Sequence, residues 1–295
     1  MEELNGRFGI EGQVVFRAGP SGVFVDVEND GARAMIALQG AQVVDWVPRG
    51  EAPVIWLSRD AKFAEGKSIR GGAPVCWPWF GPHRSELSFP AHGFARTVPW
   101  EVIETRALAD GSTRLIFRLK GTEASRTQWP HATQLENHIT VGKTLEVDLV
   151  TRNFGNESVT IGQALHTYFS VGDIRKVSLH GLDGRPYLDK VDGFSRKIQG
   201  GEVTFAGETD RIYLDSTGDC IIADPVLGRS IRIAKRGSAS TVVWNPWDEK
   251  ADKMGDMGEN GWLEMLCVEN ANAADDVRSL APGAEHHLWV SYRVE

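Results

Sequence analysis

The chain has 295 residues, of which 41% are hydrophobic, and its formal net charge at pH 7 is −8. This length and apolar content are enough to bury a large core, in one domain or in two. The negative charge argues against nucleic acid and against an anionic membrane surface as partners of the whole protein.

Targeting signals and cysteine use predict a cytoplasmic protein. The chain contains no run of 18 apolar residues and no basic region followed by an apolar run at its start. We therefore expect neither a membrane span nor a signal peptide. The cysteines lie far apart, in apolar surroundings and without CxxC spacing, which is typical of reduced core residues; they are Cys76, Cys220 and Cys267.

The N-terminal part of the chain has the rhythm of a β meander. Short β-rich runs, separated by Asn, Asp, Gly and Pro, lie at 23–27, 34–38, 43–47 and 54–57. A single short helix is expected over 58–66.

The segment 67–96 interrupts this rhythm. Glycine and proline recur through it among tryptophan and phenylalanine, so neither a regular helix nor a central strand fits the segment. We expect a long shaped loop, and such a loop in a compact domain is typically a functional site when it is too aromatic to be disordered. Its charged residues sum to 4 − 1 = +3, from Lys67, Arg70, Arg84 and Arg96 against Glu86. This excess indicates a small anionic ligand, unless the arginines pair with nearby carboxylates.

Strand signals resume after the loop and continue to the C-terminus. Between 145 and 149, leucine and valine alternate with glutamate and aspartate, which is the period of a half-buried strand. No amphipathic helix longer than about three turns is indicated, although 248–257 favours a short one. Strands without intervening helices predict antiparallel pairing in a β-sandwich or barrel, and the lack of a linker or composition break favours a single domain over residues 1–295.

His166 is a candidate for proton transfer. It lies in a strand-like segment in which alternation places it on the same face as Ala164 and Tyr168. A histidine with an ordinary pKa near ~6.5 on a rigid element suits a general acid or base. The alternative is a hydrogen-bonded structural histidine.

Glu269 is a second candidate. Period two places it with Met265 and Cys267 on a face that is expected to be interior. A carboxylate there is costly unless it is paired or used, and partial desolvation would raise its pKa and make it a stronger base. The alternative is that Glu269 marks the solvent end of its strand. A carboxylate and an imidazole on separate strands can form an acid/base pair if they meet.

Other polar residues fit a sugar site. Asp210 and Asn245 are turn residues by default, but Asp210 could also accept hydrogen bonds from hydroxyls. Rings mixed with Asp, Asn, His and Arg suit a sugar, because the apolar faces of a pyranose rest on rings while its hydroxyls need polar partners. No phosphate-loop, dinucleotide or metal-ligand spacing is convincing, so we expect neither a cofactor nor a metal.

Six motifs, taken in order, carry a family resemblance. They are SIRGGAPVCWPWFG (68–81), HGFAR (92–96), LHTYF (165–169), TDRIY (209–213), VWNPW (243–247) and CVE (267–269). Together they resemble the motifs of glucose-6-phosphate 1-epimerases, the hexose-6-phosphate mutarotase branch of the aldose 1-epimerase family. The match spans most of the chain, and several long motifs in order are more specific than any one of them.

The resemblance implies a large, galactose-mutarotase-like antiparallel β-sandwich with few short helices. It implies an isomerase that interconverts the α and β anomers of a hexose 6-phosphate without cofactor or metal. The expected substrate is glucose 6-phosphate. By the family pattern, Glu269 takes the proton of the anomeric hydroxyl and His166 protonates the ring oxygen. The pattern assigns sugar contacts to His92 and Asp210 and the 6-phosphate, for which guanidinium forks are apt, to Arg70 and Arg96.

Some alternatives stay open at this level. Arg84 lies in a variable stretch of the family pattern, where it either adds a phosphate contact or faces solvent. The alternative function is a noncatalytic or regulatory sugar-phosphate-binding β-sandwich, although a pure binder needs no proton-transfer pair. The expected partner is a small sugar phosphate, bound by a monomer.

Overall fold

The computed structural model describes residues 1–295, and its strands pair antiparallel throughout the named sheets. A nine-stranded sheet has the order β16 (Val203–Thr204), β13 (Ser178–His180), β18 (Cys220–Asp224), β19 (Arg229–Arg236), β23 (Glu285–Val294), β9 (Leu145–Asn153), β8 (Thr133–Val141), β7 (Thr113–Leu119) and β6 (Trp100–Ala107). An eight-stranded sheet has the order β15 (Ser195–Ile198), β14 (Pro186–Asp189), β17 (Thr209–Tyr213), β20 (Ser240–Asn245), β21 (Met265–Asn272), β11 (Gln163–Leu165) and β5 (Val75–Cys76), with β12 (Tyr168–Ser170) also paired to β21.

Smaller elements complete the chain. A four-stranded sheet contains β1 (Val14–Gly19), β2 (Gly22–Glu28), β3 (Ala32–Ala37) and β4 (Gln42–Pro48), and β10 (Val159–Ile161) pairs with β22 (Arg278–Leu280). The α-helices are α1 (Glu2–Phe8), α2 (Glu123–Gln128) and α3 (Trp247–Met254), and the 3-10 turns are η1 (Ala95–Thr97), η2 (Ile174–Lys176), η3 (Gly261–Glu264) and η4 (Ala274–Asp276). None of the helices has the length and apolar character that crossing a membrane requires. The expected antiparallel β-sandwich with few short helices is confirmed.

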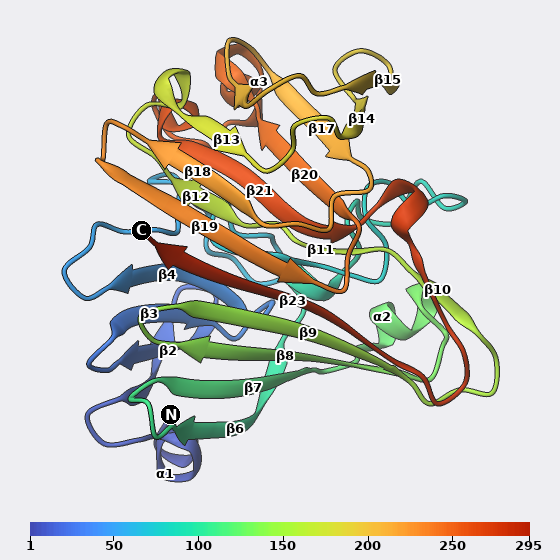
Figure 1. The fold of residues 1–295 in the computed structure, drawn as a ribbon. Coiled ribbons are helices and arrows are strands. Elements are labelled where there is room, and N and C mark those ends of the chain that lie inside the picture. The colour runs from blue at the N-terminus through green and yellow to red at the C-terminus, as the bar shows by residue number, and fades with distance from the viewer.

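The main core lies between the two large sheets. It takes Leu149 and Val290 from the nine-stranded sheet and Val268 and Phe169 from the eight-stranded one. The alternation expected in 145–149 is confirmed, because the leucine and valine side chains of β9 are buried there while the two acidic residues are half-buried. Figure 1 shows β23 between β19 and β9, with β20 and β21 beyond them and α3 at one end of these strands.

The chain between the small sheet and the site differs from expectation in two respects. The β-rich run over 54–57 forms only the isolated bridges of Ile55 and Leu57 and no regular strand. The helix expected over 58–66 does not form, because Ser58 Oγ accepts the backbone N–H of Asp60 at 3.1 Å and the chain turns instead. Side-chain hydrogen bonds of this kind compete with helix formation. The segment 67–96 is irregular, as expected, apart from β5 and η1. The three cysteines are free and buried, as expected.

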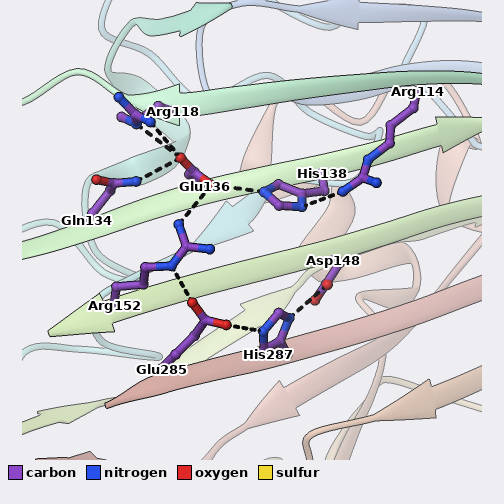
Figure 2. Close-up of polar contacts among 9 residues, drawn as sticks. All are labelled: Arg114, Arg118, Gln134, Glu136, His138, Asp148, Arg152, Glu285 and His287. Carbon is purple, nitrogen blue, oxygen red and sulfur yellow. Dashed lines mark hydrogen bonds and ion pairs between the residues drawn. The ribbon is translucent and has the colours of Figure 1, made fainter. Parts of the chain in front are cut away.

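A charged network covers part of the nine-stranded sheet on the face opposite the core (Figure 2). The buried carboxylate of Glu136 accepts hydrogen bonds from Arg118 at 2.9 Å, Gln134 at 2.7 Å and Arg152 at 3.2 Å. It also lies 3.0 Å from His138 Nε2. A buried carboxylate needs partners of this kind, so the network compensates for the burial of Glu136.

The same network predicts a pH-dependent contribution to stability from His287. Its Nδ1 lies 2.8 Å from Asp148 and its Nε2 lies 2.6 Å from Glu285. Partial burial opposes the charged imidazole, but the two carboxylates outweigh it and raise the pKa of His287 above 6.5. A raised folded-state pKa gives a stabilisation that is fully present below pH ~6.5 and is lost as pH rises through the folded-state value. Because the pair is half-exposed, His287→Gln should lower Tm by only about 1–3 °C at pH 6 and by less at pH 9, as measured by calorimetry.

Candidate active site

A cavity of about 290 Å³ opens at the eight-stranded sheet. All six site residues expected from the sequence line it: Arg70, His92, Arg96, His166, Asp210 and Glu269. The structure therefore brings together residues that lie up to 199 positions apart in the chain, from Arg70 to Glu269.

Alternation on neighbouring strands builds the floor of this cavity. Asp210 of β17 pairs with Trp244 of β20, and Trp244 pairs with Cys267 of β21. Cys267 in turn pairs with Tyr168 of β12. Residues opposite one another in an antiparallel sheet project to the same face, so these four side chains form one row across the sheet.

The next row of the sheet carries the proton-transfer candidates. In β11 and β21, Leu165 pairs with Asn270, and in β12 and β21, Tyr168 pairs with Cys267. The same register, continued between these pairs, places His166 opposite Glu269. The expected strand around His166 is thus split into β11 and β12, but the face predicted for His166 is correct.

Glu269 is buried because β21 is covered on both faces. Every residue of Met265–Asn272 is buried. Leu266 and Val268 face the core between the sheets, whereas Met265 and Cys267 belong to a separate apolar cluster with Tyr168. The interior face expected for Glu269 is therefore the floor of the cavity, and the reading of Glu269 as a solvent-facing strand end is wrong.

His166 and Glu269 form a close pair. Nε2 of His166 lies 3.3 Å from Oε1 of Glu269, and the two side chains are 12% and 1% exposed. The other polar atom of each, Nδ1 of His166 and Oε2 of Glu269, has no hydrogen-bond partner in the protein. Buried polar atoms are rarely left unpaired without a functional reason, so this pair is the strongest candidate for chemistry in the molecule.

Burial acts on the two groups in opposite directions. It raises the pKa of Glu269 well above 4.5, and the nearby charge of Asp210 adds to this effect. It lowers the pKa of His166 well below 6.5, and His92 and Arg96 add to that effect. Both shifts favour a neutral glutamic acid and a neutral imidazole over the charged pair.

Aromatic rings hold the imidazole of His166 in place. The ring of Tyr168 stacks on it with centroids 5.1 Å apart and an interplanar angle of 18°, and Trp244 meets it edge-on at 5.9 Å. Trp56 in turn stacks on the ring of Tyr168, with the ring centroids 5.8 Å apart. A side chain locked by packing suits proton transfer, which depends on fixed geometry.

His92 enters the cavity from a tight turn. Its φ is +67°, and the backbone N–H of Gly81 approaches its Nδ1 at 3.4 Å. The next residue must be glycine, because a Cβ on Gly93 would lie 1.9 Å from the backbone oxygen of Trp77. Burial, with the charges of Arg96 and Lys190, lowers the pKa of His92 to about 3, so its imidazole is neutral and carries its proton on Nε2.

Four cations line the cavity, and their pairing differs. Arg70 lies 3.0 Å from Asp256, Lys190 lies 2.7 Å from Asp210, and Lys250 lies 2.6 Å from Glu208. Arg96 has no carboxylate within 4.0 Å and donates one hydrogen bond, to the backbone oxygen of Ala91. The sequence-level alternative, that the loop arginines simply pair with carboxylates, therefore applies to Arg70 but not to Arg96.

Two of these cations, Lys190 and Lys250, were not predicted from the sequence. Lys190 reaches the site because the turn after β14 brings its backbone N–H to the carbonyl of Asp210 at 2.9 Å. No local signal distinguishes Lys190 from the other charged residues of that turn. Lys250 projects from α3, whose existence was expected but whose position over the cavity was not.

Two further candidates lie elsewhere. Arg84 lines an adjoining cavity of about 390 Å³, which shares Phe80 and Lys190 with the first. Arg84 is exposed there and makes no ion pair. Asn245 is fully buried, accepts the backbone N–H of Trp247 at 2.9 Å and donates to the carbonyl of Met265 at 2.9 Å, so its default reading as a structural turn residue is correct.

Comparison with known proteins gives a consistent result. The family model described as aldose 1-epimerase matches residues 24–293. A protein of Escherichia coli (strain K12) named "Putative glucose-6-phosphate 1-epimerase" is 42% identical over 269 residues, which are 91% of this chain and 89% of that protein. The crystal structure of a "putative mutarotase (YeaD)" from Salmonella typhimurium superposes with a TM-score of 0.89 at 35% identity, covering 96% of this chain and 93% of the other. A "galactose mutarotase related enzyme" from Lactobacillus acidophilus has the same fold, with a TM-score of 0.71 at 16% identity over 92% of this chain and 96% of that one.

Proposed function

The chain belongs to the aldose 1-epimerase family. We propose that it interconverts the α and β anomers of a hexose 6-phosphate by opening and closing the sugar ring, and that glucose 6-phosphate is its substrate. The close pair of His166 and Glu269 in a cation-lined cavity is the observation that carries this proposal. The curated relatives named for glucose 6-phosphate support the choice of sugar. The noncatalytic alternative is not favoured, because binding alone gives no reason to bury such a pair.

The chemistry follows from the pair. Glu269 as the carboxylate takes the proton of the C1 hydroxyl, the C1–O5 bond breaks, and His166 as the imidazolium gives its proton to O5. The product is the open-chain aldehyde beside a neutral glutamic acid and a neutral imidazole. Rotation about C1–C2 and the same two transfers in reverse close the ring on the other carbonyl face. Each positioned group contributes about 10²–10⁴-fold.

Burial of the pair favours ring opening. In this mechanism the pair carries one proton throughout. It is a carboxylate and an imidazolium while the sugar is cyclic, and a neutral glutamic acid and a neutral imidazole while the sugar is open. Because burial raises the pKa of Glu269 and lowers that of His166, it stabilises the neutral arrangement relative to the charged one. The cavity therefore offsets part of the cost of forming the aldehyde.

The surroundings of the two groups orient the sugar. In a pyranose, C1 is bonded to C2 on one side and to O5 on the other, and O5 leads to C5 and C6. Asp210 lies on β17, on the side of β21 away from His166, and Lys190 pairs with it at 2.7 Å, so both lie beyond the base, toward C1 and C2. Arg70 donates to the hydroxyl of Tyr168, whose ring stacks on His166, so it lies on the side of the acid, toward O5 and C6, where the phosphate is attached. His92, with its proton on Nε2, donates to a sugar oxygen.

Arg96 and Arg70 are the phosphate ligands in this arrangement. Arg96 has no competing carboxylate, and Arg70 keeps one nitrogen, Nη2, without a hydrogen bond in the protein. Guanidinium groups suit phosphate because their planar donors match its oxygens. The proposal includes a monomer in the cytoplasm, where sugar phosphates are substrates and the three free cysteines stay reduced.

Anomer exchange is the direct test. Purified protein should accelerate the α-to-β exchange of glucose 6-phosphate, measured by NMR exchange spectroscopy, with heat-inactivated protein as the control. Acceleration should persist after dialysis against a chelator, because the acid and the base are both side chains of the chain. Saturable binding of glucose 6-phosphate without faster exchange would instead support the noncatalytic alternative.

A further inference from the structure

Arg70 is held in the cavity by two partners on different parts of the chain. Its Nε donates to Asp256 Oδ1 at 3.0 Å, and its Nη1 donates to the hydroxyl of Tyr168 at 2.9 Å. The side chains of Arg70 and Asp256 are 25% and 21% exposed. A guanidinium is planar, so fixing two of its nitrogens fixes the direction of the third, Nη2.

Asp256 is itself anchored without help from Arg70. Its backbone oxygen accepts a hydrogen bond from Ser58 Oγ at 2.7 Å. The next residue, Met257, is 2% exposed and belongs to the apolar cluster that contains Trp56 and Tyr168. The segment thus presents its carboxylate at a fixed place, and Arg70 adapts to it.

The Tyr168 side of the arrangement is fixed independently. Its ring is packed between Trp56 and His166 and is 3% exposed. Loss of the Asp256 carboxylate would therefore free Arg70 to rotate while the Tyr168 ring, and the His166 ring stacked on it, stay in place. Phosphate recognition and proton transfer are separable at this point.

The charge of Asp256 works against phosphate binding, because it cancels the charge of Arg70 and repels a dianion. Its geometry works for phosphate binding, because an unanchored arginine loses several rotatable bonds on binding. We propose that Asp256 is a positioning residue that gives this enzyme its preference for phosphorylated sugars by holding Arg70 with its Nη2 nitrogen free. This proposal rests on the proposed function, since it assigns Arg70 to the 6-phosphate.

Two variants separate geometry from charge. Asp256→Asn keeps an oxygen that accepts from Arg70 Nε and removes the charge, so KM for glucose 6-phosphate should stay the same or fall. Asp256→Ala removes the acceptor, so KM for glucose 6-phosphate should rise about 10-fold. The kcat for glucose 6-phosphate and the kcat/KM for glucose should each change less than twofold. Glu259→Ala is the matched control, because Glu259 is an exposed carboxylate of the same segment without an ion pair.

A second readout does not depend on turnover. Titration with inorganic phosphate, followed by ³¹P NMR, should give a higher Kd for Asp256→Ala than for the unmodified chain, with Asp256→Asn at or below it. Equal losses on glucose and glucose 6-phosphate, or an Asn variant as weak as the Ala variant, would overturn the positioning role. If the unmodified chain does not exchange anomers, the proposed function fails, but the phosphate titration still decides the role of Asp256. Asp256→Ser replaces the Ala variant if the latter does not fold.

Discussion

Replacement of Glu269 with glutamine should lower kcat for anomer exchange of glucose 6-phosphate by about 10²–10⁴-fold, because an amide cannot accept the proton of the C1 hydroxyl. The size and shape of the side chain are kept, so the row of β21 side chains should pack as before. NMR exchange spectroscopy on both proteins measures the loss. Glu249→Gln, at an exposed carboxylate of α3, is the control and should keep full activity.

The same substitution should leave the protein equally stable or make it more stable. Burial raises the folded-state pKa of Glu269, so the folded state binds more protons than the unfolded one and stability falls as pH rises above about 4.3. Glutamine removes this cost, and Tm of the Glu269→Gln protein should equal or exceed that of the unmodified chain at pH 7. A loss of activity with no loss of Tm identifies a functional group rather than a structural one. Activity within tenfold of the unmodified chain would exclude Glu269 as the base.

His166 should behave differently from Glu269 under substitution. Its ring is packed against Tyr168 and Trp244, so His166→Ala removes both the acid and a stacking partner. His166→Gln fills more of the space and is the better variant for comparing activity at matched stability. If exchange survives in that variant, another group must protonate O5.

The floor of the site can be predicted from the sequence, because the two-residue period of a strand fixes the face on which each side chain lies. Alternation placed His166 with Tyr168, and Glu269 with Cys267, and both placements are correct. The contact between His166 and Glu269 cannot be predicted from alternation alone. It depends on the register between β11, β12 and β21, which joins segments about a hundred residues apart.

The walls of the site were harder to predict because they come from loops and turns. Lys190 enters through the path of a turn, and the carboxylate of Asp256 reaches Arg70 across 186 positions of sequence. Such contacts depend on how separate elements pack, and no local pattern records them. The family motifs indicated Arg70 and Arg96 as equivalent phosphate ligands, whereas the structure distinguishes a paired arginine from an unpaired one.

That difference makes Arg96 the more sensitive probe of substrate choice. Arg96→Ala should lower the ratio of kcat/KM for glucose 6-phosphate to that for glucose on the order of 100-fold, because it removes a half-buried charge of the cavity that has no carboxylate partner in the free protein. Some activity on glucose should also be lost, since Arg96 lines the cavity that holds the sugar. Arg96→Lys keeps the charge but not the planar guanidinium. Its ratio should lie between that of the unmodified chain and that of Arg96→Ala.

The matched control for this experiment is Arg84→Ala. Arg84 is also an unpaired arginine of the loop 67–96, but it lines the adjoining cavity rather than the one that contains His166 and Glu269. Its removal should leave the ratio unchanged if it faces solvent, and a lower ratio would reveal a further phosphate contact. Equal losses on glucose and glucose 6-phosphate in Arg96→Ala would mean that Arg96 serves the sugar ring or the proton transfer, and that an unphosphorylated aldose is the substrate.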